Sequence, residues 1–192
     1  MSSTGGLKQI MKTAVYILTL ILLISCSSHG QTQDQISLSP NTKIEIGFSP
    51  NGSSLDIILR GIQQAQKSIL VAAYSFTSKP ISTALLEAHN RGISVQVIAD
   101  KKSNSGKYSA VTFLANHGVP VRVNGNYQIF HHKFMVIDGL HVETGSFNYS
   151  AAAVNRNAEN VLMIWNTKEI AEKYTQQWNI LCDESEIIKP NY

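Results

Sequence analysis

Four polar side chains recur at regular spacings in the second half of the chain. His131 and Lys133 are two residues apart, and Ser146 and Asn148 are again two apart, in the pattern H-x-K-x4-D-x6-G-S-x-N. The anionic oxygens of a phosphodiester repel nucleophiles. A metal-free catalyst therefore needs a nucleophile that is neutral near pH 7 and a fixed positive charge on those oxygens, and histidine and lysine supply both. The pattern predicts a site that cleaves phosphodiesters.

The two-residue spacing fits a β-strand. Successive side chains of a strand point to opposite faces, so His131 and Lys133 are expected on one side and His132 on the other. His132 is then interpreted as part of the scaffold. A second strand is predicted to return beside the first, because Asp138-Gly139 lies between two apolar, β-branched runs. The returning strand would bring a hydroxyl and an amide, both donors to phosphate oxygens, next to the lysine.

This pattern closely resembles the HKD motif of the phospholipase D superfamily. The similarity spans roughly residues 43 to 182 and points to the small, single-motif bacterial endonucleases of that family. It is carried further by Gly47-Phe48-Ser49-Pro50, Ala73-Tyr74-Ser75-Phe76-Thr77 and Asn157-Ala158-Glu159-Asn160-Val161-Leu162-Met163-Ile164-Trp165. The resemblance implies an α/β fold: a mixed β-sheet with helices on both faces and one HKD motif per chain.

The resemblance also implies a mechanism with two histidines. One attacks phosphorus to give a phosphohistidine, and the other protonates the leaving oxygen. Because the chain carries one motif, we expect a homodimer whose twofold axis places His131 of both subunits across one phosphate. Glu159 is expected to orient the imidazole, and Asp138 to bind backbone donors at its turn. The side chains assigned to the catalytic site are His131, Lys133, Asp138, Ser146, Asn148 and Glu159.

A metal site is the chemical alternative, since His, Asp and Glu occur together. Lys133 argues against it, because an ammonium group repels a divalent ion. Adjacent histidines also diverge on a strand, unlike the i, i+4 pair of a zinc helix. We therefore expect no metal and no other cofactor, and activity that survives EDTA.

The beginning of the chain has the pattern of an export signal. Lys8 and Lys12 precede an uncharged apolar run, residues 14–24, that is short for a membrane span. The segment Leu23-Ile24-Ser25-Cys26 resembles a bacterial lipobox. We predict a signal peptide over residues 1–26, lipidation at Cys26, and a periplasmic enzyme tethered to the outer membrane by that lipid. The alternative is an ordinary signal peptide cleaved before Gln33.

The remainder is long enough for one domain. The chain has 192 residues, 43% of them hydrophobic, which is enough to bury a core. Residues 27–42 are rich in Ser, Gln and Thr and are predicted to be a flexible tether, followed by one nuclease domain over residues 43–192. If Cys26 carries lipid, Cys182 has no partner, so we expect a half-buried thiol and no disulfide framework.

Charge adds a prediction about substrate binding. Without the leader the net charge falls from +3 to +1, because Lys8 and Lys12 are lost and no acidic residue is. A polyanion must then be held by a local groove rather than by the field of the whole molecule. Lys101, Lys102 and Lys107 follow an apolar strand and are the predicted substrate-binding residues. The alternative is that they are simply solvated.

Apolar strands alternate with amphipathic helices along the domain. Strands are predicted at 43–48, 68–75, 93–99, 119–123 and 159–165, besides the two motif strands. Helices are predicted at 54–67, from Pro80 to Arg91, before His117-Gly118, from Tyr149 and at 167–181.

We expect a non-specific endonuclease that cleaves DNA, with RNA as the second substrate to test, because about 150 residues leave little room for a pocket that holds acyl chains. The alternatives are a phospholipase D-type lipid hydrolase and a non-catalytic component that binds or takes up nucleic acid.

Overall fold

The computed structural model describes residues 35–106 and 109–190. The chain divides after Gln35 into two units, and the fold below is that of the second. The predicted signal peptide and Cys26 lie outside the described residues, so export and lipidation remain predictions from sequence. No helix in the described ranges is both long enough and apolar enough to cross a membrane.

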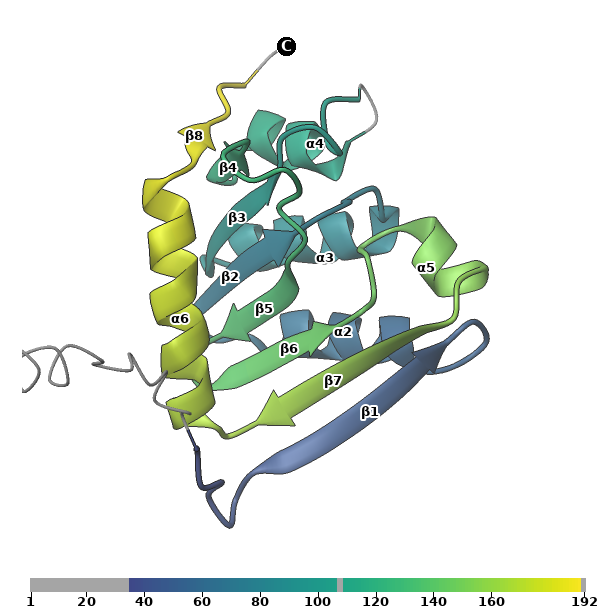
Figure 1. Ribbon diagram of the computed structural model, residues 1–192, viewed down its shortest axis with the longest axis vertical. Coiled ribbons are helices and arrows are strands. Elements are labelled where there is room, and N and C mark those ends of the chain that lie inside the picture. The colour runs from purple at the N-terminus through teal and green to yellow at the C-terminus, as the bar shows by residue number, and fades with distance from the viewer. Residues whose placement is uncertain (1–34, 107–108, 191–192) are drawn as a thin grey trace, which may run out of the picture. The chain divides into compact units, whose positions relative to one another are not determined.

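One mixed sheet forms the centre of this unit (Figure 1). Its strands run in the order β1-β7-β6-β5-β2-β3-β4-β8. Only the β2–β3 and β3–β4 pairs are parallel, and the other neighbours are antiparallel. The strands are β1 (Lys43–Ser49), β2 (Ser68–Ala73), β3 (Ser94–Asp100), β4 (Val121–Asn124), β5 (Lys133–Ile137), β6 (His141–Gly145), β7 (Glu159–Trp165) and β8 (Glu186–Ile187).

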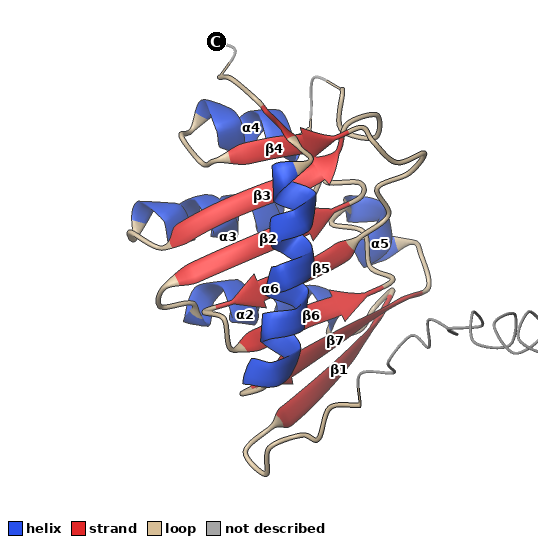
Figure 2. Ribbon diagram, turned by 60° about the vertical axis from the view of Figure 1, so that its left-hand side comes forward, coloured by secondary structure: helices blue, strands red, loops and turns tan. Residues whose placement is uncertain are grey.

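Helices cover both faces of the sheet. Figure 2 shows α6 in front of the strands and α2, α3 and α4 behind them, while α5 lies near the ends of β6 and β7. The predicted α/β fold with helices on both faces is confirmed. The helices are α2 (Ser54–Gln64), α3 (Lys79–Asn90), α4 (Ala110–Asn116), α5 (Ala151–Asn155) and α6 (Lys168–Asp183).

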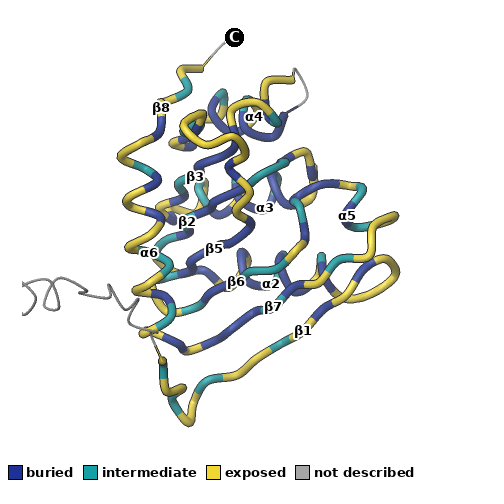
Figure 3. Tube along the Cα trace, viewed as in Figure 1, coloured by how far each residue is buried: buried dark blue, intermediate teal, exposed yellow. Residues whose placement is uncertain are grey.

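The core consists of two apolar clusters, one on each side of the sheet. The larger joins α2, α3 and α4 to side chains such as Val71, Val97 and Met135. The smaller packs Trp178 and Leu181 of α6 against the opposite face. The central strands are buried on both faces, as expected for near-continuous apolar runs, whereas the edge strand β1 is largely exposed (Figure 3).

Asp138 joins the β5–β6 hairpin to the start of β2. Asp138 and Gly139 have φ values of 57° and 63°, as a two-residue type I′ turn requires. The Asp138 carboxylate accepts hydrogen bonds from the backbone N–H groups of Gln66, Lys67 and Ser68 at 2.7 to 3.1 Å. The predicted hairpin is present, and Asp138 binds backbone donors at the end of β5 away from His131.

Several predicted boundaries were wrong for identifiable reasons. Helix α2 ends at Gln64 rather than Lys67, because Asp138 binds the next backbone donors. Helix α5 starts at Ala151 rather than Tyr149, because the Ser150 hydroxyl caps it by accepting from Ala153 N–H. Strand β8 was not predicted, since two residues carry no periodic signal.

The described part of the predicted tether contains no helix or strand. Its last residues are nevertheless bound to the domain. The Thr42 hydroxyl donates to the Asn166 carbonyl at 3.1 Å, and the Asn166 side chain donates to the Asn41 carbonyl at 3.2 Å. The ordered domain therefore begins slightly before β1.

Candidate active site

His131 and Lys133 lie close together at one end of the central strands, where β2 ends and β5 begins. We call this end of the strands the catalytic edge. Strand β5 starts at Lys133, so the expectation that His131 lies within the strand was wrong. The two side chains nevertheless share one neighbour. The rings of His131 and Tyr74 have centroids 4.7 Å apart, and Lys133 Nζ lies 5.2 Å from the Tyr74 ring centroid. Lys133 Nζ also donates to the His131 carbonyl at 2.9 Å, which ties the strand end to the histidine.

Lys133 is a buried cation, only 7% exposed. Burial lowers the pKa of its ammonium group, and the nearby charge of Glu159 partly opposes that effect. A cation with little hydration interacts more strongly with an anionic oxygen than a surface lysine does. Lys133 is therefore suited to the role predicted for it, a fixed positive charge beside a phosphoryl group.

His132 has ring neighbours different from those of His131 and Lys133. Its ring makes edge contacts with Phe130 and Phe134, with centroids 5.2 and 5.6 Å away. Burial lowers the pKa of His132, and the charges of Lys133 and His131 lower it further. His132 is nevertheless an exposed residue, and it lines the groove described below.

Ser146 and Asn148 follow directly after β6. The side chains between and after them, Phe147 and Tyr149, are fully buried. The Ser146 hydroxyl donates to Glu159 at 2.6 Å and accepts from Asn160 N–H at 3.0 Å. Asn148 Oδ1 is buried without a hydrogen-bond partner among the described residues.

Glu159 begins β7 beside this segment. Its carboxylate accepts hydrogen bonds from Ser146 and from the Asn157 side chain, at 2.6 and 3.0 Å. Neither bond involves His131, so orientation of the imidazole by Glu159 remains a prediction. Glu159 binds the Ser146 hydroxyl and places negative charge near Lys133.

Two buried polar residues that the sequence analysis did not single out support the site. Asp100, at the end of β3, accepts from the N–H groups of Ser103 and Phe130, the residue before His131. Burial alone would raise the pKa of Asp100, but these hydrogen bonds outweigh it and lower that pKa. Asn104 donates to the carbonyl of Tyr74 at 2.6 Å. The position of Asp100, a polar residue at the end of an apolar strand, could have indicated its role from sequence.

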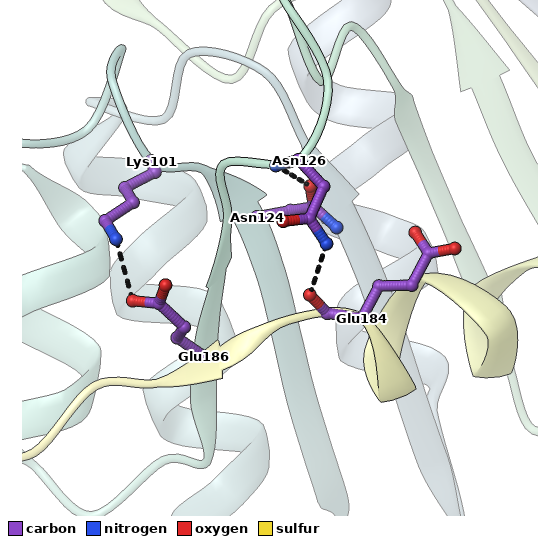
Figure 4. Close-up of polar contacts among 5 residues, drawn as sticks. All are labelled: Lys101, Asn124, Asn126, Glu184 and Glu186. Carbon is purple, nitrogen blue, oxygen red and sulfur yellow. Dashed lines mark hydrogen bonds and ion pairs between the residues drawn. The ribbon is translucent and has the colours of Figure 1, made fainter.

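The predicted substrate-binding lysines have different surroundings. Lys101 forms an ion pair with Glu186 at 2.7 Å, which fastens β8 to the end of β3 (Figure 4). The same figure shows the Asn126 side chain donating to the carbonyl of Glu184. Lys102 is exposed, and Lys107 lies outside the described residues. A substrate would compete with Glu186 for Lys101.

A groove of about 530 Å³ lies between the motif and α6. Lys173, Tyr174 and Gln177 line it from the helix. Lys173 and Gln177 are four residues apart and so share one face of α6, a spacing that could have indicated them from sequence. The remaining lining residues are His131, His132, Lys133, Phe134, Thr144 and Gly145. Of the residues that the structure describes, two lysines and two histidines line the groove and no carboxylate does.

Across the described ranges, no three His, Cys, Asp or Glu side chains come together in a group that could hold a metal ion. Cys182 is a half-buried free thiol, and burial raises its pKa. Metal independence itself remains to be measured.

A mixed sheet between helices, with a histidine, a buried lysine, a serine and an asparagine at one edge, defines a site for phosphodiester chemistry. A family profile described as "Cardiolipin synthase, PLD-like domain" matches residues 58–181. The chain belongs to the phospholipase D superfamily, whose members are phosphodiester hydrolases.

Individual relatives agree with this assignment. The chain is 36% identical over 143 residues to a protein named phospholipase D from Rickettsia conorii, which covers 74% of this chain and 71% of the relative. It is 32% identical over 136 residues to a mitochondrial cardiolipin hydrolase from Chlamydomonas reinhardtii, covering 71% and 60% of the two chains. The crystal structure of Nuc, a phospholipase D family member from Salmonella typhimurium, superposes with a TM-score of 0.76 and 37% identity. That match covers 77% of this chain and 99% of Nuc.

Proposed function

We propose that this phosphodiesterase is a metal-independent, non-specific endonuclease that cleaves DNA or RNA. The observation that carries the proposal is the 530 Å³ groove beside the motif, which is lined by Lys133 and Lys173. Contacts of this kind go to phosphate and sugar and carry no sequence information. The groove also has apolar walls, including Phe134 and Tyr174, so the proposal depends on the two lysines and not on a lack of apolar surface.

In the proposed reaction, His131 attacks phosphorus and the bond from phosphorus to the leaving oxygen breaks. The partner subunit's His131 gives that oxygen its proton. Water then attacks the phosphohistidine, the partner subunit's His131 takes the proton of that water and so regains its acid form, and the imidazole leaves. Lys133 and Asn148 bind the phosphoryl oxygens, whose charge increases in the transition state. Ser146, held by Glu159, supports them.

The reaction requires a second imidazole, and one apolar surface supports a homodimer. Ile44, Ile46 and Phe48 project from β1 at 49%, 60% and 63% exposure. They lie on the α6 side of the sheet, because they pair in register with Ile164, Leu162 and Asn160 of β7. We call Ile44, Ile46, Phe48 and Leu162 the apolar strip. Asn160, opposite Phe48, binds Ser146, so the strip extends to the catalytic edge.

A lipid hydrolase is the second candidate. The observation that favours it is the identity to proteins named phospholipase D and mitochondrial cardiolipin hydrolase. Both substrates present a phosphodiester to the same motif, so the difference must lie in the walls of the groove.

One assay separates these candidates. The wild-type protein in EDTA is offered plasmid DNA, RNA, and vesicles of phosphatidylcholine with cardiolipin, in parallel. We expect nucleic acid to be cleaved and the lipids to remain intact. His131→Ala should abolish cleavage, and Lys133→Ala should lower kcat by about 10² to 10³. Lys168→Ala, a surface lysine of α6 paired with Glu172, is the matched control and should retain wild-type activity. Cleavage of lipid alone, or activity that EDTA removes and magnesium restores, would contradict the proposal.

A further inference from the structure

A carboxyl group and a phenol form a buried hydrogen bond beneath the site. Glu143, on β6, is 1% exposed, and Tyr149 is fully buried. The Tyr149 hydroxyl donates to Glu143 Oε2 at 2.6 Å. In register, Glu143 lies between Met135 of β5 and Met163 of β7, so its side chain enters the larger core cluster. A glutamate is rarely fully buried, and the HKD pattern assigns this one no role.

The environment of Glu143 favours its uncharged form. Burial raises its pKa to about 8, and the hydrogen bond from Tyr149 only partly opposes that rise. Burial likewise raises the pKa of Tyr149, so the phenol keeps its proton. The pair is therefore a neutral acid that accepts a hydrogen bond from a neutral phenol.

Tyr149 connects two parts of the site. It directly follows Asn148, and its carbonyl accepts hydrogen bonds from the N–H groups of Thr77 and Ser78, both at 2.8 Å. Its ring also meets Phe76 edge to face, with centroids 5.6 Å apart. Tyr149 thus links the segment that carries Asn148 to the loop after β2.

That loop begins with Tyr74, which contacts both His131 and Lys133. A displacement of Tyr149 would therefore move Asn148 relative to the histidine and the lysine. A buried hydroxyl without an acceptor is costly, so removing the carboxyl of Glu143 should displace the phenol. A shift of about 1 Å in a catalytic group can cost about 100-fold in rate.

We propose that Glu143, acting through the Tyr149 hydroxyl, is a positioning residue that holds Asn148 in place for the phosphodiester reaction. The proposal rests on the proposed function for its effect on rate. Because the side chain is buried, Glu143 does not touch the substrate. Because the acid is neutral, its role is to accept a hydrogen bond, and glutamine should replace it.

The test compares four variants on a small diester, bis(p-nitrophenyl) phosphate. Glu143→Gln should keep kcat within about threefold of wild type, because its amide oxygen accepts the same hydrogen bond. Glu143→Leu and Tyr149→Phe should each lower kcat by about tenfold or more, with KM changed by less than about threefold. The double variant Glu143→Leu/Tyr149→Phe should be no slower than the slower single variant, because both changes remove one interaction.

A destabilised control separates positioning from loss of stability. Trp178→Phe removes an indole hydrogen bond to the Val71 carbonyl on the opposite face of the sheet. It should lower Tm and leave kcat unchanged. The side-chain amide signal of Asn148 in a ¹H–¹⁵N spectrum gives a readout that does not depend on activity. It should shift or broaden in Glu143→Leu and Tyr149→Phe, and keep its wild-type position in Glu143→Gln.

Two results would overturn the inference. One is a kcat near wild type in Glu143→Leu and Tyr149→Phe together with an unmoved Asn148 amide. The other is a Glu143→Gln variant as slow as Glu143→Leu. A wild-type protein that cleaves no diester would refute the proposed function, while the Asn148 signal would still report whether Glu143 positions it.

Discussion

At the scale of single residues, two buried ionisable groups on adjacent strands differ in charge. Lys133 and Glu143 are both buried, yet Lys133 lies at the catalytic edge beside Glu159, whereas Glu143 has only a phenol as its partner. The first group is suited to hold a phosphate, and the second to remain neutral inside the core. Their separate surroundings explain why two ionisable residues on adjacent strands serve different purposes.

Glu143 makes stability depend on pH. Its pKa is about 8 in the folded protein and near 4.5 when unfolded. The folded state therefore binds an extra proton between these values. Its contribution is complete below about pH 4.5 and is lost as the pH rises to about 8. We expect the Tm of Glu143→Gln minus the Tm of wild type to increase as the pH rises from 5 to 8. Circular dichroism melting curves measure both values. A constant difference over this interval would show that Glu143 does not titrate in it.

At the scale of elements, the two ends of strand β5 in the β5–β6 hairpin have different roles. Asp138 lies at one end of β5 and binds the backbone before β2, while His131 and Lys133 lie at the other end. The HKD pattern thus combines a structural residue, Asp138, with the two residues of the candidate site, His131 and Lys133, in one continuous segment.

Variants of Asp138 therefore test whether this residue contributes to stability and not to catalysis. Asp138→Ala removes a charged acceptor of three backbone N–H groups and should lower the free energy of unfolding by about 1.5 to 3 kcal/mol. Its kcat below the melting transition should stay near wild type. Urea unfolding and diester cleavage measure the two effects. Asp138→Asn keeps an acceptor and tolerates positive φ, so it should be milder. A large loss of kcat with unchanged stability would instead give Asp138 a catalytic role.

Most strands and helices were predictable from sequence, because apolar alternation and the Asp-Gly turn are local signals. The motif residues were predictable for the same reason. Glu143 was not, because a glutamate in a strand usually faces solvent, and its burial depends on pairing with Met135 and Met163. The partner of Lys101 was also missed, since Glu186 is distant in sequence and lies on a strand too short to recognise.

At the scale of the whole molecule, the proposed homodimer predicts a specific surface. Ile46→Glu places a charge in the apolar strip and should give a folded monomer with at least about tenfold lower activity, because one imidazole is then missing. Light scattering reports the mass and circular dichroism the fold. Ile187→Glu is the control, since Ile187 is 66% exposed on β8 at the opposite edge of the sheet. An active Ile46→Glu monomer would refute the shared site.

Strand β1 has a consequence for colloidal behaviour. It is an edge strand whose outer backbone groups pair with no other described strand, and its projecting isoleucines and phenylalanine are exposed. Such an edge is a template for intermolecular pairing and precipitation. If the apolar strip is the dimer contact, dilution or a weakened contact would expose it. Solubility during purification would then decline together with self-association.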